Sequence, residues 1–244
     1  MAVGTTGQQT PAHTKVKVLT TIPADPMPSS TQRPPIHTPR LTIRPMNAAD
    51  ISAIHSLRAQ PEVMQYTSAG RPERDEAESQ VWLNRFLPPR DVETYNFALC
   101  DRVSGELVGV GGVHTQRNER FGWPEVGYML KKEWWGKGLA TEFLGAFLRA
   151  WWALERKEVE LEVHWESIKE MLGPEVGEAH DVEDTPRVPE MLFAIVESNT
   201  PGSARVLEKT GFEQYAQWEE PDIRYGREAE TATLKAFRLM APSK

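Results

Sequence analysis

Apolar and polar residues along this chain change repeatedly between two spacings. An apolar residue at every second position is typical of a strand with one buried face, whereas spacings of three and four are typical of a helix. Alternating or short continuous apolar runs predict seven strands: "RLTIRP" (40–45), "YNFALC" (95–100), "LVGVGGV" (107–113), "EVGYML" (125–130), "LFAIVE" (192–197), "EQYAQW" (213–218) and "TLKAFRL" (233–239). Ser104 and Gly105 separate the second run from the third, which predicts an antiparallel hairpin.

Four further segments have the helical spacing: 47–63, 73–87, 139–154 and 200–212. The third has the strongest apolar stripe, formed by Leu139, Phe143, Phe147, Trp151 and Leu154. In the fourth, Thr200 is the predicted N-cap, Pro201 occupies the first helical position and Gly211 follows the end. The resulting order, β-α-α-β-β-β-α-β-α-β-β, predicts an α+β domain with a largely antiparallel sheet.

Three regions do not follow this order. Residues 1–39 are rich in Thr and Pro, which predicts a flexible tail ahead of a domain at 40–244, although "KVKVLTTI" (15–22) alternates well enough to form one added edge strand. The segment "EVELEVHW" (158–165) fits a strand and a helix equally well. Residues 165–191 are acidic, contain three prolines and exceed an ordinary connection in length, which predicts either a lid or a disordered insertion.

Charge and composition limit the possible partners. The net charge of -7 and the pI near 5.5 argue against a nucleic-acid or anionic-membrane partner, because Lys and Arg drive those interactions, and they suit a cationic amine better. The single cysteine, Cys100, excludes an internal disulfide and a multi-cysteine zinc site, and no metal is expected. No apolar run approaches the roughly 18 residues that span a bilayer, and no signal peptide is recognisable. We therefore predict a cytoplasmic protein, either a monomer or a homodimer.

Two glycines, Gly136 and Gly138, stand directly ahead of the strongest predicted helix. The start of a helix exposes unpaired amides and the positive end of the helix dipole, so glycines there allow the backbone to surround a phosphate, with Lys137 adding charge. The alternative is that the glycines only permit a tight turn. A Walker A loop is not present, and the dinucleotide fingerprint is disfavoured because residues 131–135 separate the turn from its strand.

Together, the strand "EVGYML", the turn "WWGKGLAT", the strand "AIVESN" and the helix "SARVLEKTGF" resemble the GNAT N-acetyltransferases, specifically their RimJ/RimL-like branch. The resemblance extends from about residue 40 to residue 239. The phosphate-loop pattern of that family corresponds to Trp135, Gly136, Lys137, Gly138, Leu139 and Ala140, and its second motif to Asn199, Ser203, Leu207, Glu208, Lys209, Gly211 and Phe212. The resemblance implies a three-layer α+β fold, in which helices flank a twisted, mostly antiparallel sheet that splays between two strands.

The resemblance also implies acetyl-CoA binding. The pyrophosphate would lie on the amides of residues 136–141, the pantetheine arm would pair with the strand edge at 128–130, and Asn199 would face the arm or the thioester, since Thr200 already caps the helix. The implied cofactor-binding residues are Tyr128, Met129, Leu130, Trp135, Gly136, Lys137, Gly138, Leu139, Ala140, Thr141, Asn199 and Ser203.

Acetyl transfer requires a neutral amine, a hydrogen-bond donor for the oxyanion and a proton for the departing thiolate. Many family members supply that proton from a Tyr where this chain has Leu207, so Ser203 is the implied substitute, although an ordinary helix serine is an equal alternative. Glu125 is the preferred base, ahead of Glu197 and His114. We expect an N-acetyltransferase that moves acetyl from acetyl-CoA to a primary amine by direct attack, the amine belonging to a protein N-terminus or a small molecule. The alternative is a catalytically inactive CoA-binding sensor or interaction module.

Overall fold

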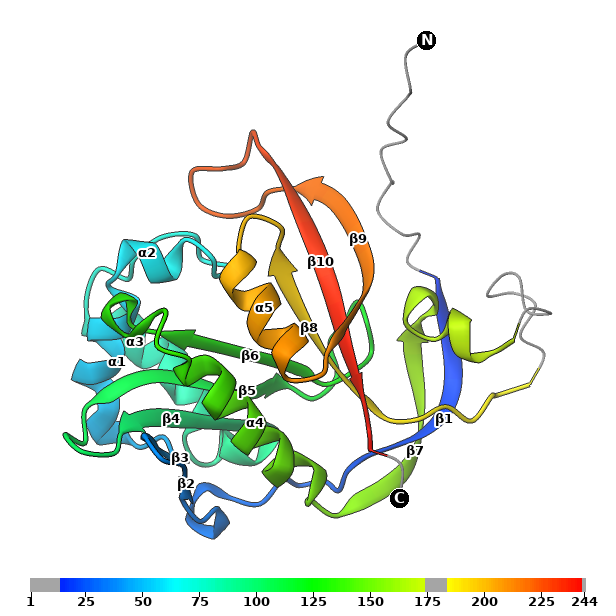
Figure 1. Cartoon of the computed structure of the whole chain (residues 1–244), viewed down its shortest axis with the longest axis horizontal. Coiled ribbons are helices and arrows are strands. Elements are labelled where there is room, and N and C mark those ends of the chain that lie inside the picture. Colours follow the sequence, from blue (N-terminus) through cyan, green and yellow to red (C-terminus); the bar gives the residue numbers. More distant parts are fainter. Residues whose placement is uncertain (1–13, 174–183, 243–244) are drawn as a thin grey trace.

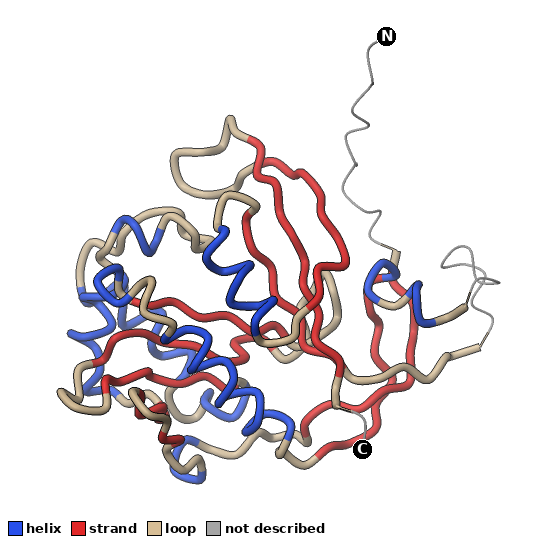
Figure 2. Tube along the Cα trace, viewed as in Figure 1, coloured by secondary structure: helices blue, strands red, loops and turns tan. Residues whose placement is uncertain are grey.

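The structure, a computed structural model, describes residues 14–173 and 184–242 (Figures 1 and 2). Its main sheet runs in the order β2 (Ile36–His37), β3 (Leu41–Pro45), β4 (Tyr95–Asp101), β5 (Leu107–Thr115), β6 (Glu125–Leu130), β8 (Met191–Glu197), β10 (Thr231–Met240) and β9 (Glu213–Pro221). All neighbouring strands are antiparallel except β6 and β8. The predicted α+β fold with a mostly antiparallel sheet is therefore confirmed.

Helices cover both faces of this sheet. The helices α1 (Ile51–Arg58), α2 (Pro61–Met64) and α3 (Glu76–Leu83) precede β4, and α4 (Leu139–Trp152) and α5 (Pro201–Lys209) flank β8 in sequence. Short 3-10 helices lie at Ser30–Gln32, Ala48–Asp50, Asn84–Phe86, Arg90–Glu93, Lys132–Trp134, Trp165–Ser167 and Lys169–Met171. Figure 1 shows α4 and α5 together on one face of the sheet.

The strand β4 shows how the layers are built. Phe97 and Leu99 pack into the cluster that contains the α4 stripe, whereas Ala98 and Cys100 pack into the cluster that contains α1 and Leu83 of α3. Because both faces of the strand are buried, the four residues from Phe97 to Cys100 are all apolar instead of alternating. Cys100 is a free, buried thiol whose pKa is raised by that burial, as expected of a packing residue.

A second, two-stranded sheet lies beside the main one. The strand β1 (Lys15–Pro23) pairs antiparallel with β7 (Arg156–His164), from Lys15↔His164 to Pro23↔Arg156. The flexible tail predicted for residues 1–39 is corrected for residues 14–39, which form β1, a 3-10 helix and β2 of the main sheet. The alternative of an added strand at 15–22 holds, and residues 1–13 lie outside the described part. The strand forms because residues 158–164 of the ambiguous segment supply its backbone partner. The same pairing shows that these residues form a strand and not a helix.

The described ends of the acidic 165–191 segment pack against the two sheets. Ser167 is fully buried, and its carbonyl accepts a hydrogen bond from Arg238 of β10 (3.0 Å), while Val188 donates from its amide to Leu19 of β1 (3.0 Å). Figure 1 shows these ends beside β1 and β7, on the side of the molecule away from α2. The centre of the segment, residues 174–183, lies outside the described residues, so the lid remains a prediction.

The strands β6 and β8 diverge, which leaves a V-shaped opening in the sheet. They are parallel neighbours at one point only, Glu125↔Phe193, where the amide of Phe193 donates to the carbonyl of Pro124 (3.1 Å). From there the strands separate toward their C-terminal ends, as Figure 1 shows. Among the described residues, none of the helices combines the length and the apolar content needed to cross a bilayer.

Candidate active site

The β6 edge of the V carries backbone groups without a strand partner. The amide of Lys131 donates to Val108 of β5 (2.9 Å), so alternate residues of β6 direct their peptide groups toward β5. Tyr128 and Leu130 therefore direct theirs toward β8, across the V. The indole Nε1 of Trp135 donates to the carbonyl of Leu130 (2.7 Å), which shows that this edge accepts a hydrogen bond from outside the sheet.

The β8 edge has the same property. The amide of Ser198 donates to Thr233 of β10 (2.8 Å), so Val196 and Ala194 direct their peptide groups toward β10. Ile195 directs its peptide groups toward β6, whereas the carbonyl of Glu197 already accepts hydrogen bonds from the amide (2.9 Å) and the hydroxyl of Thr200. Two facing strand edges with peptide groups that lack a strand partner fit an extended ligand that contains amide groups, because such a ligand can pair as an added strand does.

The glycine turn stands at the wide end of the V. Gly136 (φ 71°) and Gly138 (φ 76°) both adopt the left-handed conformation, so the turn needs glycine at these positions. Gly138 is also the N-cap of α4, and it leaves the first-turn amides without a side-chain cap. The tight turn and the anion site are thus compatible, because the conformation that the glycines permit directs uncapped amides outward.

An arginine from the β2–β3 turn braces the glycine turn, and the sequence alone did not indicate it. Nη1 of Arg40 donates to the carbonyl of Lys137 (2.7 Å), and the guanidinium forms an ion pair with Glu142 of α4 (2.6 Å). Thr38 donates to the same carboxylate (2.6 Å). Burial tends to raise the pKa of Glu142, but the hydrogen bonds from Thr38 and Arg40 outweigh it and lower that pKa. The ammonium of Lys137 lies 4.7 Å from the ring centroid of Trp134.

Glu125 and His114 meet at the narrow end of the V. Nε2 of His114 lies 3.6 Å from Oε2 of Glu125, and the side-chain amide of Asn118 (Nδ2) donates to the same oxygen (2.8 Å). Gly127 makes room for the imidazole, since a Cβ there would lie 3.2 Å from Cε1 of His114. Burial lowers the pKa of His114, with a contribution from Arg85, although Glu125 opposes it. The imidazole is therefore neutral at pH 7 and able to accept a proton.

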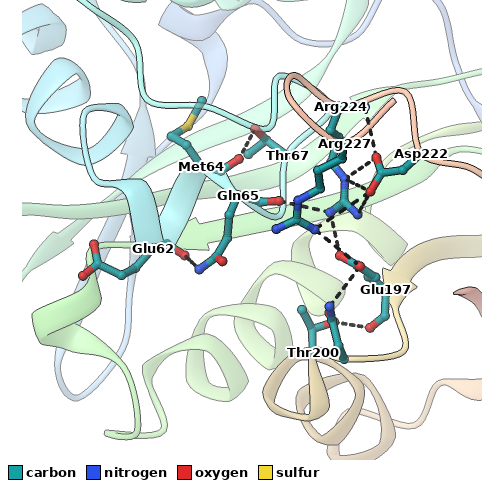
Figure 3. A network of polar contacts seen from close by, with 10 residues as sticks. Glu62, Met64, Gln65, Thr67, Glu197, Thr200, Asp222, Arg224 and Arg227 are labelled. Atoms are coloured by element: carbon teal, nitrogen blue, oxygen red, sulfur yellow. Dashed lines mark hydrogen bonds and ion pairs between the residues drawn. The ribbon is translucent and has the colours of Figure 1, made fainter. Parts of the chain in front are cut away.

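Glu197, the other carboxylate considered as a base, is held in an ion-pair network (Figure 3). Arg224, in the loop between β9 and β10, donates to Glu197 (2.5 Å) and to Asp222 (Nε to Oδ1, 2.7 Å). The hydrogen bond from Arg224 lowers the pKa of Asp222 to about 2. The side-chain amide of Asn199 donates to the same Glu197 carboxylate (2.9 Å). The network thus occupies both Glu197 and Asn199.

The same network joins α2 to both sides of the V. Nη1 of Arg224 also donates to the carbonyl of Gln65, the residue after α2 (3.0 Å; Figure 3). At the other end of α2, Gln60 accepts from the amide of Lys132 (2.8 Å), and Glu62 forms an ion pair with the Lys132 ammonium (2.5 Å). These contacts connect the turn after β6 with the loop beside β8, so α2 spans the wide end of the V.

The helix α5 begins at the end of β8 and faces the V. Thr200 is its N-cap as predicted, but the Thr200 hydroxyl donates back to the carbonyl of Glu197 instead of capping a helix amide. Leu207 is 1% exposed and packs in the main core. The carbonyl of Ser203 accepts a hydrogen bond from the hydroxyl of Tyr128 (3.3 Å), so the structure brings β6 and the first turn of α5 together.

No cluster of three or more His, Cys, Asp or Glu side chains suited to a metal ion occurs within residues 14–173 and 184–242. The candidate site thus consists of a braced glycine turn at a helix start, two free strand edges and a carboxylate–imidazole pair.

We compared the chain with known protein families. Residues 40–213 match the acetyltransferase (GNAT) domain family. The chain belongs to the GNAT acetyltransferase family.

Several solved structures share the fold of this GNAT acetyltransferase. A GNAT-family acetyltransferase from Bacillus anthracis has a TM-score of 0.56 at 19% identity and covers 85% of this chain and 99% of its own. Spermidine N-acetyltransferase from Vibrio cholerae, in complex with CoA and spermine, has a TM-score of 0.55 at 17% identity (84% and 97% covered). A GCN5-related N-acetyltransferase from Brucella melitensis has a TM-score of 0.57 at 15% identity (87% and 80% covered).

Similarity in sequence extends to a curated protein. The Bacillus subtilis (strain 168) protein YkkB is 30% identical over 115 residues, which are 46% of this acetyltransferase. The match spans 64% of the length of YkkB. The low identity of the structural relatives means that they establish the fold and not the acceptor.

Proposed function

We propose that this GNAT acetyltransferase transfers the acetyl group of acetyl-CoA to a primary amine by direct attack of the amine on the thioester. The observation that carries the proposal is the V between β6 and β8, with the uncapped start of α4 at its wide end. The amides of residues 136–141 would hold the pyrophosphate, and the edges at Tyr128, Leu130 and Ile195 would pair with the pantetheine amides. The acetyl group would then reach the narrow end, where Glu125 and His114 lie.

In this proposal Glu125 and His114 take the proton from the attacking amine. Deprotonating an α-amine with a pKa near 8 costs about 1.4 kcal/mol at pH 7, whereas a lysine with a pKa near 10.4 costs about 4.6 kcal/mol. A partly buried, neutral imidazole is a sufficient base for the first kind of amine. We therefore propose an α-amine of a peptide or a small-molecule amine of similar pKa as the acceptor.

The RimJ/RimL-like branch is the part of the family that we propose for this chain. The support is the pattern at Asn199, Ser203 and Leu207 followed by "EKTGF", together with Trp135 ahead of the first glycine.

A second candidate function is binding of CoA without catalysis, as a sensor or interaction module. The observation in its favour is that Leu207 is a core residue, so the usual proton donor is missing. Thiol release from acetyl-CoA, measured against a panel of amines that includes peptides with free N-termini, separates the two functions. We expect the rate of thiol release to saturate as the concentration of one class of amine is raised. Tight CoA binding without release for any amine would instead support the sensor.

A further inference from the structure

The helix α5 lacks a phenol that could protonate the departing thiolate. Leu207 is surrounded by the main core, with Phe143 and Phe212 in the same cluster. The thiolate of CoA still requires a proton or a strong hydrogen bond as the carbon–sulfur bond breaks. The donor must therefore come from another element that reaches the V.

Tyr128 reaches the V from β6. Strand alternation places Val126, Tyr128 and Leu130 on the face covered by α4 and α5, where the ring of Tyr128 lies edge-on to Phe143 with centroids 6.4 Å apart. The hydroxyl crosses the gap to the first turn of α5 and donates to the carbonyl of Ser203 (3.3 Å). A partly buried phenol thus lies between the free strand edge and the helix where the family usually carries its tyrosine.

We propose that Tyr128 is the catalytic residue that protonates the thiolate, an assignment that rests on the proposed acetyl transfer. The amine nitrogen bonds to the acetyl carbon, the carbon–sulfur bond breaks, and its electron pair passes to sulfur. As Oη of Tyr128 gives its proton to the sulfur, it takes up, through water, the proton that leaves the newly acylated nitrogen. The free thiol therefore forms without a free phenolate, and the enzyme returns to its starting form.

The arrangement of β6 separates the two proton transfers. Glu125 and Gly127 face the α1–α3 side with His114, whereas Tyr128 faces the α4–α5 side, three residues or about 10 Å along the strand. The base and the acid thus act on opposite faces of one strand, with the thioester between them.

The environment of Tyr128 keeps the phenol protonated. Burial raises the pKa of the Tyr128 phenol to about 12, so the hydrogen-bond-donating form predominates at any assay pH well below that value. The phenol now donates to the carbonyl of Ser203, which lies within α5. That carbonyl also accepts a hydrogen bond within the helix, so it keeps a partner when the phenol turns toward sulfur.

The first test is Tyr128→Phe, which removes one oxygen and keeps the ring. We expect kcat to fall about 100-fold while the Kd for acetyl-CoA changes less than about threefold. The matched control is Tyr66→Phe at an exposed position (45% exposed), which should leave kcat unchanged. Wild-type turnover in Tyr128→Phe overturns the assignment.

The second test measures binding instead of turnover. Above the thiol pKa of about 8.5, the wild-type protein should bind CoA about tenfold more tightly than desulfo-CoA, because Tyr128 donates to the thiolate. Tyr128→Phe should bind both equally. A wild-type protein without this preference overturns the assignment even if the variant does not fold. If no amine supports turnover, the proposed function fails, and this comparison still reports on Tyr128.

Discussion

Gly138 combines two roles at the start of α4. Its left-handed backbone (φ 76°) sets the direction of the turn, and the lack of a side chain leaves the following amides open. An L-residue at this φ is strained, and an acidic one also places negative charge at the helix start. The two effects can be separated because a second glycine with nearly the same backbone, Gly105 (φ 75°), lies in the β4–β5 turn.

Gly138→Asp is expected to weaken acetyl-CoA binding at least about tenfold, because the carboxylate repels the pyrophosphate. Isothermal calorimetry measures this directly. Gly105→Asp introduces the same residue at the same backbone conformation and should leave the Kd unchanged, while Gly138→Ala isolates the strain. An unaltered Kd in folded Gly138→Asp would remove the phosphate-turn assignment.

His114 and Glu125 are expected to set the acid limb of the pH profile. Burial places the pKa of His114 below its ordinary 6.5, so the neutral form persists to lower pH and the acid limb of kcat/KM should lie below 6.5. Glu125→Gln and His114→Gln should each lower kcat/KM about 100-fold. His55→Gln, on α1, is the control. The assignment is contradicted if the limb persists unchanged in His114→Gln.

At the scale of elements, ion pairs between distant segments hold the turns around the V. Arg40 joins the β2–β3 turn to α4, and Arg224 joins the β9–β10 loop to α2 and β8. The two arginines differ in exposure, 49% for the Arg40 side chain and 10% for that of Arg224. Loss of the exposed Arg40 should therefore affect acetyl-CoA binding, whereas loss of the buried Arg224 should affect the stability of the fold.

Arg40→Met removes the brace on the carbonyl of Lys137 and is expected to raise the Kd for acetyl-CoA about threefold to tenfold, with kcat unchanged. Calorimetry and steady-state kinetics give the two values. Arg74→Met breaks an ion pair with Glu78 elsewhere on the surface and is the matched control. Equal Kd values for the two variants would mean that the brace has no role in binding.

Arg224→Met should cost about 3 kcal/mol of unfolding free energy, because it removes the closer cationic partner of the buried Asp222 carboxylate and leaves only Arg227 at 3.9 Å. Asp222 has a folded pKa near 2, below its ordinary value, so the pair stabilises the protein above about pH 4 and loses this effect as pH falls toward 2. Urea titrations should show that the difference in unfolding free energy between Arg224→Met and the wild type becomes smaller as the pH falls over that interval. Arg187→Met, which breaks the exposed pair with Glu158, should cost less than about 1 kcal/mol.

Local patterns were sufficient for most elements. The apolar stripe of Leu139 to Trp151 and the signals at Thr200 to Gly211 depend on residues close in sequence, and α4 and α5 lie where they predicted. The ambiguity at 158–165 had no local solution, since only β1 supplies the partner that makes it a strand.

The candidate site was predictable where it depends on backbone conformation, as at Gly136 and Gly138. It was not predictable where it depends on tertiary partners. The brace from Arg40 to Glu142 spans about a hundred residues, and the engagement of Glu197 by Arg224 requires the loop to fold back. No spacing rule reports such contacts.

At the scale of the whole molecule, the two sheets share one apolar cluster. Val18 of β1 and Val163 of β7 pack with Phe193 of β8 and Trp218 of β9. The added sheet is therefore continuous with the core of the acetyltransferase fold and supports the closed end of the V, where β8 begins.

Val18→Asp should lower the free energy of unfolding by about 4 kcal/mol, because it places a charge in this cluster and removes apolar contacts. Val103→Asp makes the same change at a valine that is 96% exposed and should alter it by less than about 0.5 kcal/mol. Chemical denaturation measures both. Equal stability of the two variants would show that β1 does not pack as described.

The pairing of β1 with β7 has a consequence for synthesis. About 130 residues separate the nearest paired positions, Pro23 and Arg156, so β1 leaves the ribosome long before its partner exists. At roughly 5–20 residues per second the delay is about 7 to 26 s. During that time the apolar face of Val16, Val18 and Ile22 has no partner strand to cover it. We therefore expect this apolar face to be open to chaperones that bind short apolar stretches, because β1 completes its sheet only after most of the acetyltransferase has been made.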